Sequence, residues 1–369
     1  MWLIHRFGPR KPPRRRARPK RPRTTSLRVE RLEDRFCPSG GYLLVPDFDK
    51  HNVLRFDAAT GAFVDQFVSR KSGGLNQPWN VLIGPHDGDL YVSTGHFRGP
   101  GQIKAVLHYD GTTGAFLDEF VQRSQMDMAH AVMFGPDGNL YVGVRDDEGG
   151  HPKGGRIARF DGTTGAFMDD FVPRLSGGLL HPLAHVFGPS GRGPHNLDLY
   201  VTDEDGHDVK RYDGTTGAFL GVFVAAGTGL ISDPLGLTFG PDGNLYVADF
   251  GIGAILRFQG PSGSTPGAPM PSAGNSGAVF VAPGSGGLLA RPLGVIFGPD
   301  GNGDGDQDVY VSNITFTGFY GKNGNVKRYD GLTGAFIDTF VPTGSGGLDD
   351  PSLITFTETD PVTLNYLGP

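Results

Sequence analysis

Short apolar runs separated by tight polar turns dominate the chain from about residue 41 onward. The runs span four to seven residues and are rich in β-branched and aromatic side chains, as in NLYVAD at residues 244–249. Asp-Gly or Thr-Gly pairs bound them, as at Asp242-Gly243 and Thr216-Gly217. Runs of this length and composition between turn residues predict β-strands rather than helices.

The predicted strands recur as a repeat. A Phe-Val pair ends each copy, and successive copies lie 51 to 60 residues apart. The six pairs begin at Phe67, Phe120, Phe171, Phe223, Phe280 and Phe340. A full repeat predicts four strands, named a to d here in chain order. A four-stranded unit of this size is typical of a propeller blade.

The order of the strands predicts how the repeats close on themselves. No strand a precedes the first strand b, at residues 42–45, and no complete repeat follows the sixth strand a, at residues 353–356. The C-terminal strand therefore fills the vacancy in the N-terminal blade, which removes an open sheet edge. We expect an all-β fold, a six-bladed β-propeller of four-stranded antiparallel blades. Thr363 to Tyr366 form either an additional strand or a tail.

One segment carries a family resemblance. Residues 239–249, FGPDGNLYVAD, are similar to the blade signature of NHL-repeat propellers and of the wider six-bladed group that includes gluconolactonase-like and streptogramin-lyase-like enzymes. The resemblance extends over residues 41–357. It implies the fold but leaves the function open, because propellers serve binding, structural and catalytic roles.

The charge distribution divides the chain in two. Residues 1–37 contain 13 Lys or Arg and three acidic residues, whereas the other 332 contain 20 Lys or Arg and 36 Asp or Glu. The basic core at residues 10–23 is rich in proline, which predicts a disordered segment. We therefore expect a basic leader at residues 1–40 and a propeller domain at residues 41–369.

The leader bears on localisation. Residues 27–39 contain Leu-Glu-Asp-Arg at 32–35 and resemble the LEDR-type leader of bacterial extracytoplasmic proteins. The resemblance implies a secreted or cell-surface protein. The alternatives are an inert leader and a nucleic-acid arm, since clustered basic residues bind phosphates. The acidic propeller itself should repel nucleic acid.

The sequence contains no run of 18 apolar residues, so it does not predict a transmembrane helix. We expect a monomer.

An acidic loop separates strands a and b in the last full repeat. Its oxygen donors fall on alternate positions, with Gly305 at the sixth. The donors are Asp300, Asn302, Asp304, Asp306 and Asp308. This spacing is typical of D-x-[DN]-x-[DN]-G calcium loops and resembles FG-GAP-type blades. We expect bound Ca²⁺, with Asp306 contributing its backbone carbonyl and the others their side chains.

Two plainer interpretations of the loop remain open. It is either solvated acid, or Asp308 is a turn residue, because it aligns with Asp89, Asn139, Asp198 and Asn244 in other repeats. The turn at residues 190–198 is equally long but contains one acid, so length alone does not require a metal.

Catalytic candidates are few. The resemblance to gluconolactonase-like enzymes implies metal ligands at the mouth of the central channel, but only Asn80 is an amide at the start of a strand a. His130 is the best acid–base candidate, and Asp203 and Asp249 end strands b. His181 and His185 lie roughly 13 Å apart on a strand, too far to chelate one ion together. With Cys37 as the only cysteine, a disulfide within the chain is excluded.

These observations favour a non-catalytic binding or structural module at the cell exterior, with a protein or glycan partner and a calcium loop. The alternative is a metal-dependent enzyme of lactonase or lyase type that uses His130, Asp203 and Asp249 at the channel mouth.

Overall fold

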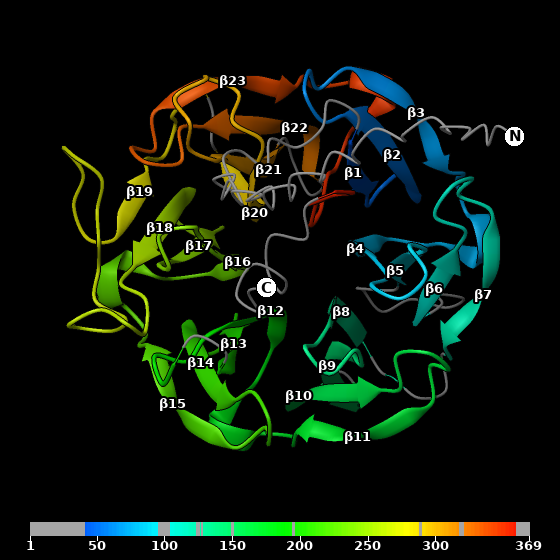
Figure 1. Cartoon of the computed structure of the whole chain (residues 1–369), viewed down its shortest axis with the longest axis horizontal. Helices are drawn as coiled ribbons and strands as arrows, with labels where there is room; N and C mark the ends of the chain where they lie inside the picture. Colours follow the sequence, from blue (N-terminus) through cyan, green and yellow to red (C-terminus); the bar gives the residue numbers. More distant parts are fainter. Residues whose placement is uncertain are drawn as a thin grey trace, which may run out of the picture. The chain divides into compact units, whose positions relative to one another are not determined.

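The computed structural model describes residues 41–94, 104–122, 126, 128–148, 151–193, 196–287, 290–316 and 321–358. The expected leader at 1–40 and the segment from Thr363 to Tyr366 lie outside them. Six four-stranded antiparallel sheets surround a central channel (Figure 1), which confirms the predicted six-bladed β-propeller. No helix in the described part of the chain is long and apolar enough to cross a membrane.

Each blade runs from strand a at the channel to strand d at the rim. The blade that closes the ring contains β24 (Thr355–Phe356), β1 (Tyr42–Asp47), β2 (Asn52–Asp57) and β3 (Phe63–Val68). The next two contain β4 (Pro78–Ile83), β5 (Leu90–Thr94), β6 (Ala105–Tyr109), β7 (Phe116–Val121), β8 (Met128–Phe134), β9 (Leu140–Glu148), β10 (His151–Phe160) and β11 (Phe167–Val172).

The remaining three blades follow in the same order. They contain β12 (Pro182–Pro189), β13 (Leu197–Asp203), β14 (Asp208–Asp213), β15 (Phe219–Val224), β16 (Pro234–Phe239), β17 (Leu245–Asp249), β18 (Ala254–Phe258), β19 (Val279–Val281), β20 (Arg291–Gly298), β21 (Asp308–Phe316), β22 (Gly321–Tyr329) and β23 (Phe336–Val341). Short 3-10 turns join blades at η1 (Ser72–Gly74), η3 (Ser176–Gly178), η4 (Thr228–Leu230) and η5 (Ser345–Gly347).

The two ends of the domain share one sheet, as the strand order predicts. β24 pairs antiparallel with β1, with Leu43 opposite Phe356 and Leu44 opposite Thr355. The backbone N–H of Thr357 donates to the carbonyl of Tyr42 over 2.9 Å. Residues more than 300 positions apart in the sequence thus complete one blade and close the ring.

A tyrosine on strand b joins a blade to the next in five of the six blades; the blade of β1 has Leu44 at this position. Tyr246 of β17 contacts Phe280 of its own strand d and Phe297 of the next strand a, edge to face, at 5.0 and 4.9 Å between ring centroids. Tyr91, Tyr141, Tyr200 and Tyr310 repeat this arrangement. Edge-to-face pairs add stability beyond their buried area, so the aromatic columns of the repeat form the contacts between blades.

A glycine in each turn between strands c and d completes this contact. Gly61 has φ 68°, and a Cβ there would lie 1.9 Å from the carbonyl oxygen of Phe340 in the preceding blade. The same approach recurs between Gly114 and Phe67, Gly165 and Phe120, Gly217 and Phe171, Gly267 and Phe223, and Gly334 and Phe280. The Phe-Val pairs of the sequence therefore meet a glycine of the next blade at every junction, including the closing one. This glycine follows Thr in five blades and Pro266 in the remaining one.

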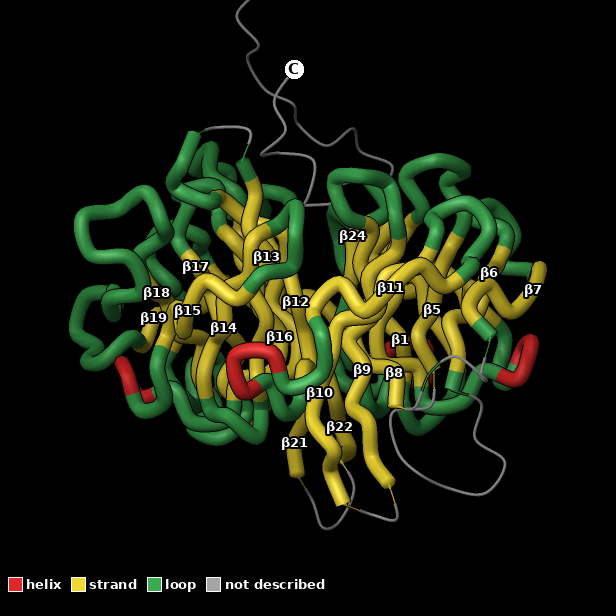
Figure 2. Tube along the Cα trace, turned by 90° about the horizontal axis from the view of Figure 1, so that it is seen from below, coloured by secondary structure: helices red, strands yellow, loops and turns green. Residues whose placement is uncertain are grey.

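Two hairpins between strands b and c are longer than the others. β9 with β10, and β21 with β22, have nine or ten residues per strand. They project from one face of the ring (Figure 2). The loops that join strand d to the next strand a lie on that same side of the blades, because successive strands are antiparallel. This face also contains the mouth of the channel at which the strands a begin.

The closing junction should be as strong as an internal one. Phe356 and Phe297 are 3% and 1% exposed, and each meets a tyrosine edge at 4.9 Å. We therefore expect Phe356→Ala and Phe297→Ala each to lower the free energy of unfolding by about 3–5 kcal/mol. Urea denaturation of both variants measures this. A much smaller loss for Phe356→Ala would mean that the C-terminal strand frays from the ring rather than closing it.

Candidate functional site

The acidic loop connects β20 to β21 and bonds largely to itself. The carboxylate of Asp300 accepts hydrogen bonds from the backbone N–H groups of Gly303 and Gly305 at 2.6 and 2.8 Å. The amide nitrogen of Asn302 donates to Asp304 and to Asp330, each at 2.9 Å. The loop carboxylates do not bring three ligand atoms within 4.8 Å of one another. The carboxylates predicted from the spacing are thus close in the sequence, but three of their oxygens do not converge on one point.

Asp308 differs from the other acids of the loop because it is buried. It is 1% exposed; one carboxylate oxygen accepts a hydrogen bond from Gly301 N–H at 2.7 Å, and the other oxygen, also buried, has no hydrogen-bond partner. Burial raises the pKa of Asp308 to about 6. The charges of Asp300 and Asp304 add to this shift, whereas Gly301 N–H and Arg328 oppose it. A buried oxygen without a partner is costly unless something binds it.

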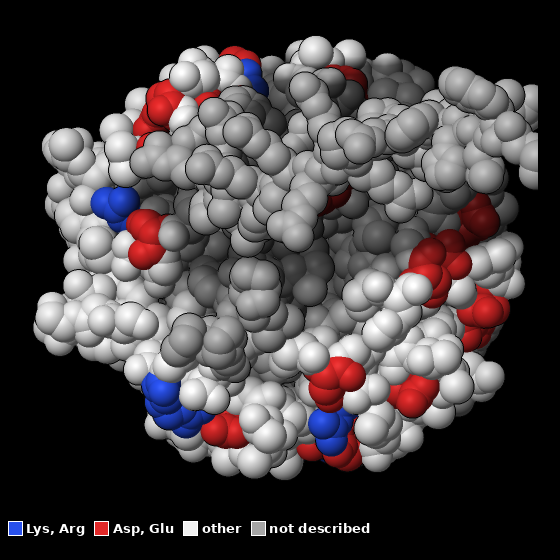
Figure 3. All heavy atoms as spheres, in the orientation of Figure 1, with Lys and Arg blue, Asp and Glu red and all other residues white. Residues whose placement is uncertain are grey.

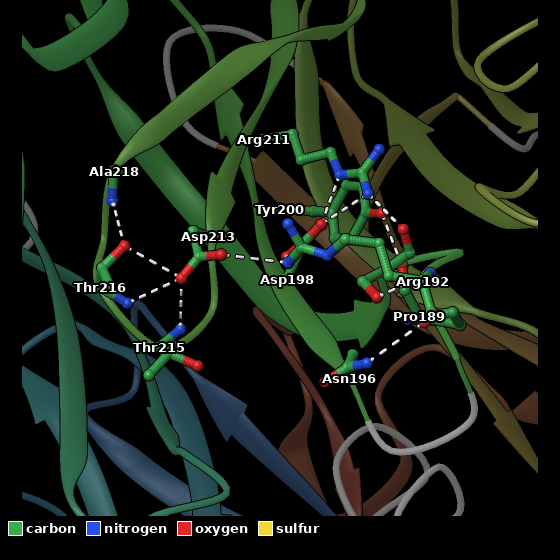
Figure 4. Close-up of polar contacts among 11 residues, drawn as sticks. Pro189, Arg192, Asn196, Asp198, Tyr200, Arg211, Asp213, Thr215, Thr216 and Ala218 are labelled. Carbon is green, nitrogen blue, oxygen red and sulfur yellow. Dashed lines mark hydrogen bonds and ion pairs between the residues drawn. The ribbon is translucent and has the colours of Figure 1, made fainter.

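The equally long turn at residues 190–198 shows what can bind such an oxygen. Asp198 occupies the place of Asp308 and is also fully buried. The guanidinium of Arg192 reaches back from the turn to Asp198 at 2.5 Å and to Asp213 at 3.1 Å (Figure 4). Arg211 donates to the second oxygen of Asp198 at 2.7 Å. In this turn the protein supplies its own cation.

The two turns align residue by residue after their shared Gly-Pro pair. Asn302 stands where the other turn has Arg192, Asp330 where it has Asp213, and Asp300 where it has Ser190. The acidic loop has therefore lost the guanidinium and gained carboxylates around the same buried aspartate. An oxygen-rich set with one unpartnered buried carboxylate oxygen fits the ligand preference of Ca²⁺.

The column to which Asp308 belongs also has a structural role. In three other blades the residue of this column accepts, through its side chain, a hydrogen bond from the N–H of the glycine that begins the turn between strands c and d. The pairs are Gly111 to Asp89 at 2.8 Å, Gly162 to Asn139 at 3.2 Å, and Gly260 to Asn244 at 2.9 Å. The column is thus a turn position, and Asp308 departs from it through its unpartnered oxygen.

The acids predicted at the channel mouth hold loops in place. Asp203 accepts hydrogen bonds from the backbone N–H groups of Leu180 and His181 at 2.9 and 2.7 Å, and lies 3.1 Å from the ammonium of Lys210. Asp249 accepts from the N–H of Ser232 at 2.7 Å and that of Asp233 at 3.1 Å. Both are fully buried. Each carboxylate ties its strand b to the loop before strand a, a role that leaves no reactive oxygen exposed.

His130 lies beside a cluster that the sequence pattern did not predict. Its Nε2 is 3.1 Å from Nε2 of His181, whose Nδ1 lies 2.5 Å from Glu204. Burial lowers the pKa of His181, but hydrogen bonds to Asp205 and Glu204 outweigh it, so the pKa is raised. The guanidinium of Arg145 lies 2.8 Å from the same Nδ1, which places a cation of the protein among these acids.

The sequence contains no spacing pattern from which this cluster could be predicted. His181 precedes a strand a, whereas Glu204 and Asp205 follow a strand b, and only the antiparallel pairing of β12 with β13 brings them together. His185 faces elsewhere, with Nε2 3.3 Å from the carbonyl of Tyr141. The prediction that His181 and His185 do not act as a pair agrees with these contacts.

The channel itself is narrow and mostly apolar. A cavity of about 100 Å³ is lined by the strands a, including Asn80, Ala131, Ala184 and Gly236. Trp79, Leu183, Leu235 and Leu293, which head these strands, are buried in one apolar cluster together with Phe48. His130 is fully buried and packs edge to face on Trp79 of this cluster, at 6.4 Å between ring centroids.

Acidic side chains spread around the rim of the face shown in Figure 3, with Lys and Arg beside them in a few places. In the turns between strands c and d, Asp57, Asp110, Asp161 and Asp213 each accept hydrogen bonds from the backbone two and three residues on. A rim of this sign attracts cations and repels phosphate.

No family model matches the chain, and none of the curated proteins does. Solved structures match. A chain in the crystal structure of a nidogen–laminin complex gives a TM-score of 0.57 at 16% identity, over 86% of this chain and 98% of that one. A luciferin-regenerating enzyme gives 0.47 at 15%, over 83% and 95%. Regucalcin, a calcium-binding protein from Agrobacterium tumefaciens, gives 0.42 at 15%, over 74% and 81%. At these identities the likeness establishes a shared propeller fold alone.

Asp350 provides a pH test of the closing junction. It is 9% exposed, and burial raises its pKa to about 8, with Asp49, Asp47 and Asp349 adding to the shift and Lys50 opposing it. The folded protein therefore holds a proton that the unfolded chain releases above about pH 4. Its free energy of unfolding should fall between pH 4 and pH 8, by at most about 1.4 kcal/mol per pH unit from this group.

Asp350→Asn removes the buried charge. We expect the variant to be more stable than the wild type at pH 8, with a smaller difference at pH 5. Thermal melts across this range measure the effect. A variant less stable than the wild type at pH 8 would show that the Asp350 carboxylate makes favourable contacts there.

Proposed function

We propose that this chain is a non-catalytic, extracytoplasmic propeller that binds Ca²⁺ in the loop at residues 300–308 and recognises a protein or glycan partner. The observation that carries the calcium site is the buried, unpartnered oxygen of Asp308, at the position where Arg192 serves Asp198 in the equivalent turn.

The donors proposed for the ion are those of the loop. Asp300, Asn302, Asp304 and Asp308 offer side-chain oxygens and Asp306 a backbone carbonyl, with water completing the shell of six to eight oxygens that Ca²⁺ prefers. The carboxylates of Asp300 and Asp304 also accept hydrogen bonds from N–H groups of the loop. Because the loop lacks a distal bidentate Glu and water has to complete the shell, we expect a modest affinity suited to the calcium levels outside cells.

The partner class rests on the shape and chemistry of the ring. The catalytic alternative needs accessible reactive groups, whereas the carboxylates of Asp203 and Asp249 are held by backbone N–H groups and His130 is fully buried. The two long hairpins, β9–β10 and β21–β22, flank the face on which they project. A face bordered by two projecting hairpins suits an extended macromolecular partner. The nidogen–laminin neighbour, a chain from a protein complex, makes a protein partner our preferred choice.

The remaining parts of the proposal rest on sequence alone. The LEDR-type leader supports a secreted or cell-surface location, and the 239–249 segment supports blades of the NHL type. Mass spectrometry of the protein from the native cell, after fractionation, would test the location.

Calcium binding has a direct test. Titration calorimetry of the full chain should detect one Ca²⁺ in this loop, and calcium at one hundred times its dissociation constant should stabilise the fold by about 2.7 kcal/mol. The double change Asp300→Ala with Asp304→Ala should abolish this gain while the blades stay folded. Wild-type protein that shows no calcium heat and no calcium-dependent shift in melting temperature would contradict the site.

The equivalent turn supplies a matched variant. Asn302→Arg places a guanidinium at the position of Arg192, within reach of Asp308 and Asp330. We expect this variant to lose the calcium-dependent stabilisation and to melt, without calcium, at or above the temperature of the calcium-free wild type. A variant that still gains stability from calcium would show that the ion does not occupy the place of the guanidinium.

A further inference from the structure

A second column of the repeat, on strand c, holds an arginine in five of the six blades, and in four of them this arginine is ion-paired with an acid. Arg257 is the exception, because its guanidinium donates to the backbone carbonyls of Met270 and Pro271. The column lies directly before the Tyr, or Phe, that ends strand c, and it contains Arg55, Arg159, Arg211, Arg257 and Arg328. Arg159 is representative: its guanidinium lies 2.6 Å from Asp169 on strand d and 3.5 Å from Asp137 in the turn before strand b. The sixth member of the column is His108 on β6.

His108 faces carboxylates on both sides of its ring. Nε2 lies 3.1 Å from Asp89 and 4.0 Å from Asp87, whereas Nδ1 lies 3.4 Å from Asp118. No Lys or Arg within the described ranges is ion-paired with these three acids. Three carboxylates thus surround one imidazole. An imidazole nitrogen with two carboxylate oxygens close by is a donor set that suits divalent transition-metal ions.

The neighbouring turns show that the acids have also lost a donor. In the next blade the amide of Asn139 donates to Asp137 at 2.8 Å, and Asn244 donates to Asp242 at 2.7 Å in the same way. At this position the blade of β4–β7 has Asp89 opposite Asp87. Two carboxylates now face each other where an amide and a carboxylate would bond, while the adjacent arginine has become histidine.

We propose that Asp87, Asp89 and His108 form a site for a divalent transition-metal ion of the Zn²⁺ class. Their ligand atoms all lie within 4.8 Å of one another. Ligands on a tetrahedral zinc lie about 3.3 Å apart, given its bond lengths of about 2.0–2.2 Å. The pair His108–Asp89 already has this spacing at 3.1 Å, and the Asp87 oxygen, 4.0 Å from Nε2, needs to approach that nitrogen by about 0.7 Å.

Asp118 completes the site as a positioning residue. Nδ1 of His108 is buried and has no hydrogen-bond partner, and the Asp118 carboxylate lies 3.4 Å from it. With a metal on Nε2 the proton of His108 would sit on Nδ1, and a small shift of Asp118 would let it accept this proton's hydrogen bond and orient the ring. The ring also stacks on Tyr91, at 4.6 Å between centroids and 13° between planes, which fixes its orientation. The side chains of Asp87 and Asp89 are 39% and 23% exposed, so an ion can enter from solvent.

The other group with comparable geometry does not need a metal. His181, Glu204 and Asp205 also bring ligand atoms within 4.8 Å, but Arg145 lies 2.8 Å from His181 and 3.3 Å from Asp205. The cation is already present there. Nitrogen ligation likewise separates the proposed site from the calcium loop, since Ca²⁺ takes oxygen ligands.

Calorimetric titration of tag-free, full-length protein with ZnCl₂ in the presence of excess Ca²⁺ tests the proposal, with Co²⁺ absorption as a spectroscopic check of nitrogen and oxygen ligation. We expect one zinc ion that His108→Arg and Asp89→Asn each remove, with affinity falling at least about 100-fold. Asp118→Asn should weaken binding by about 10–100-fold. The Asp300→Ala, Asp304→Ala variant should bind zinc as the wild type does.

His108→Arg and Asp89→Asn restore side chains that other blades carry at these positions, so we expect both variants to fold. Their melting temperatures, recorded without metal, verify this. Arg159→His places a histidine in the next blade without a second turn acid and should create no zinc site. Zinc binding unchanged by His108→Arg, or NMR showing both nitrogens of His108 protonated at neutral pH with zinc present, would overturn the proposal.

Discussion

The fold depends on one contact repeated at six junctions, in which a glycine of one blade lies against the phenylalanine carbonyl of the blade before it. The glycine must be left-handed and lack a Cβ, because any side chain atom would overlap that carbonyl. In five of the blades, a tyrosine on strand b also makes T-shaped contacts with phenylalanines of two blades, as Tyr246 does. A blade has its aromatic surface covered only when both neighbouring blades are present. Every blade is therefore complete only when the ring is closed.

This constraint explains why the architecture could be predicted from the sequence. The residues that make the junctions, Phe-Val and Thr-Gly, are also those that repeat most visibly, so their spacing gives the number of blades. The missing first strand a and the unmatched last one give the closure, now seen as Leu43 opposite Phe356. The order of the strands along the chain carries this information because successive strands pair within each blade, with β24 on β1 as the exception that closes the ring.

The candidate sites were less predictable because they join different segments of the repeat. The alternating donors at 300–308 could be seen within one loop, but their relation to Asp330 and to the Arg192 turn required the packing of strand c against the a–b turn. His108 stands in an arginine column that an alignment of the six repeats reveals. Its meaning, however, depends on Asp118 across a strand pair and Asp87 across a turn. The cluster of His130 with His181 spans two blades and left no pattern in either.

The blades share one electrostatic problem and resolve it in different ways. Each turn before strand b brings a carboxylate or an amide, at the position of Asp89, Asn139, Asp198, Asn244 or Asp308, close to other acids of its blade. Asn139 and Asn244 resolve it with an amide N–H, and Arg192 with a guanidinium. Two turns have neither: Asp89 faces Asp87 beside a histidine, and Asp308 keeps a buried oxygen without a partner. Because the surrounding geometry is that of the resolved turns, the deficit at these two positions is one of positive charge rather than of shape. The repeats can therefore be compared with one another, position by position. At these two positions a metal ion is the simplest substitute for the hydrogen-bond donor or cation that a side chain provides in the other blades.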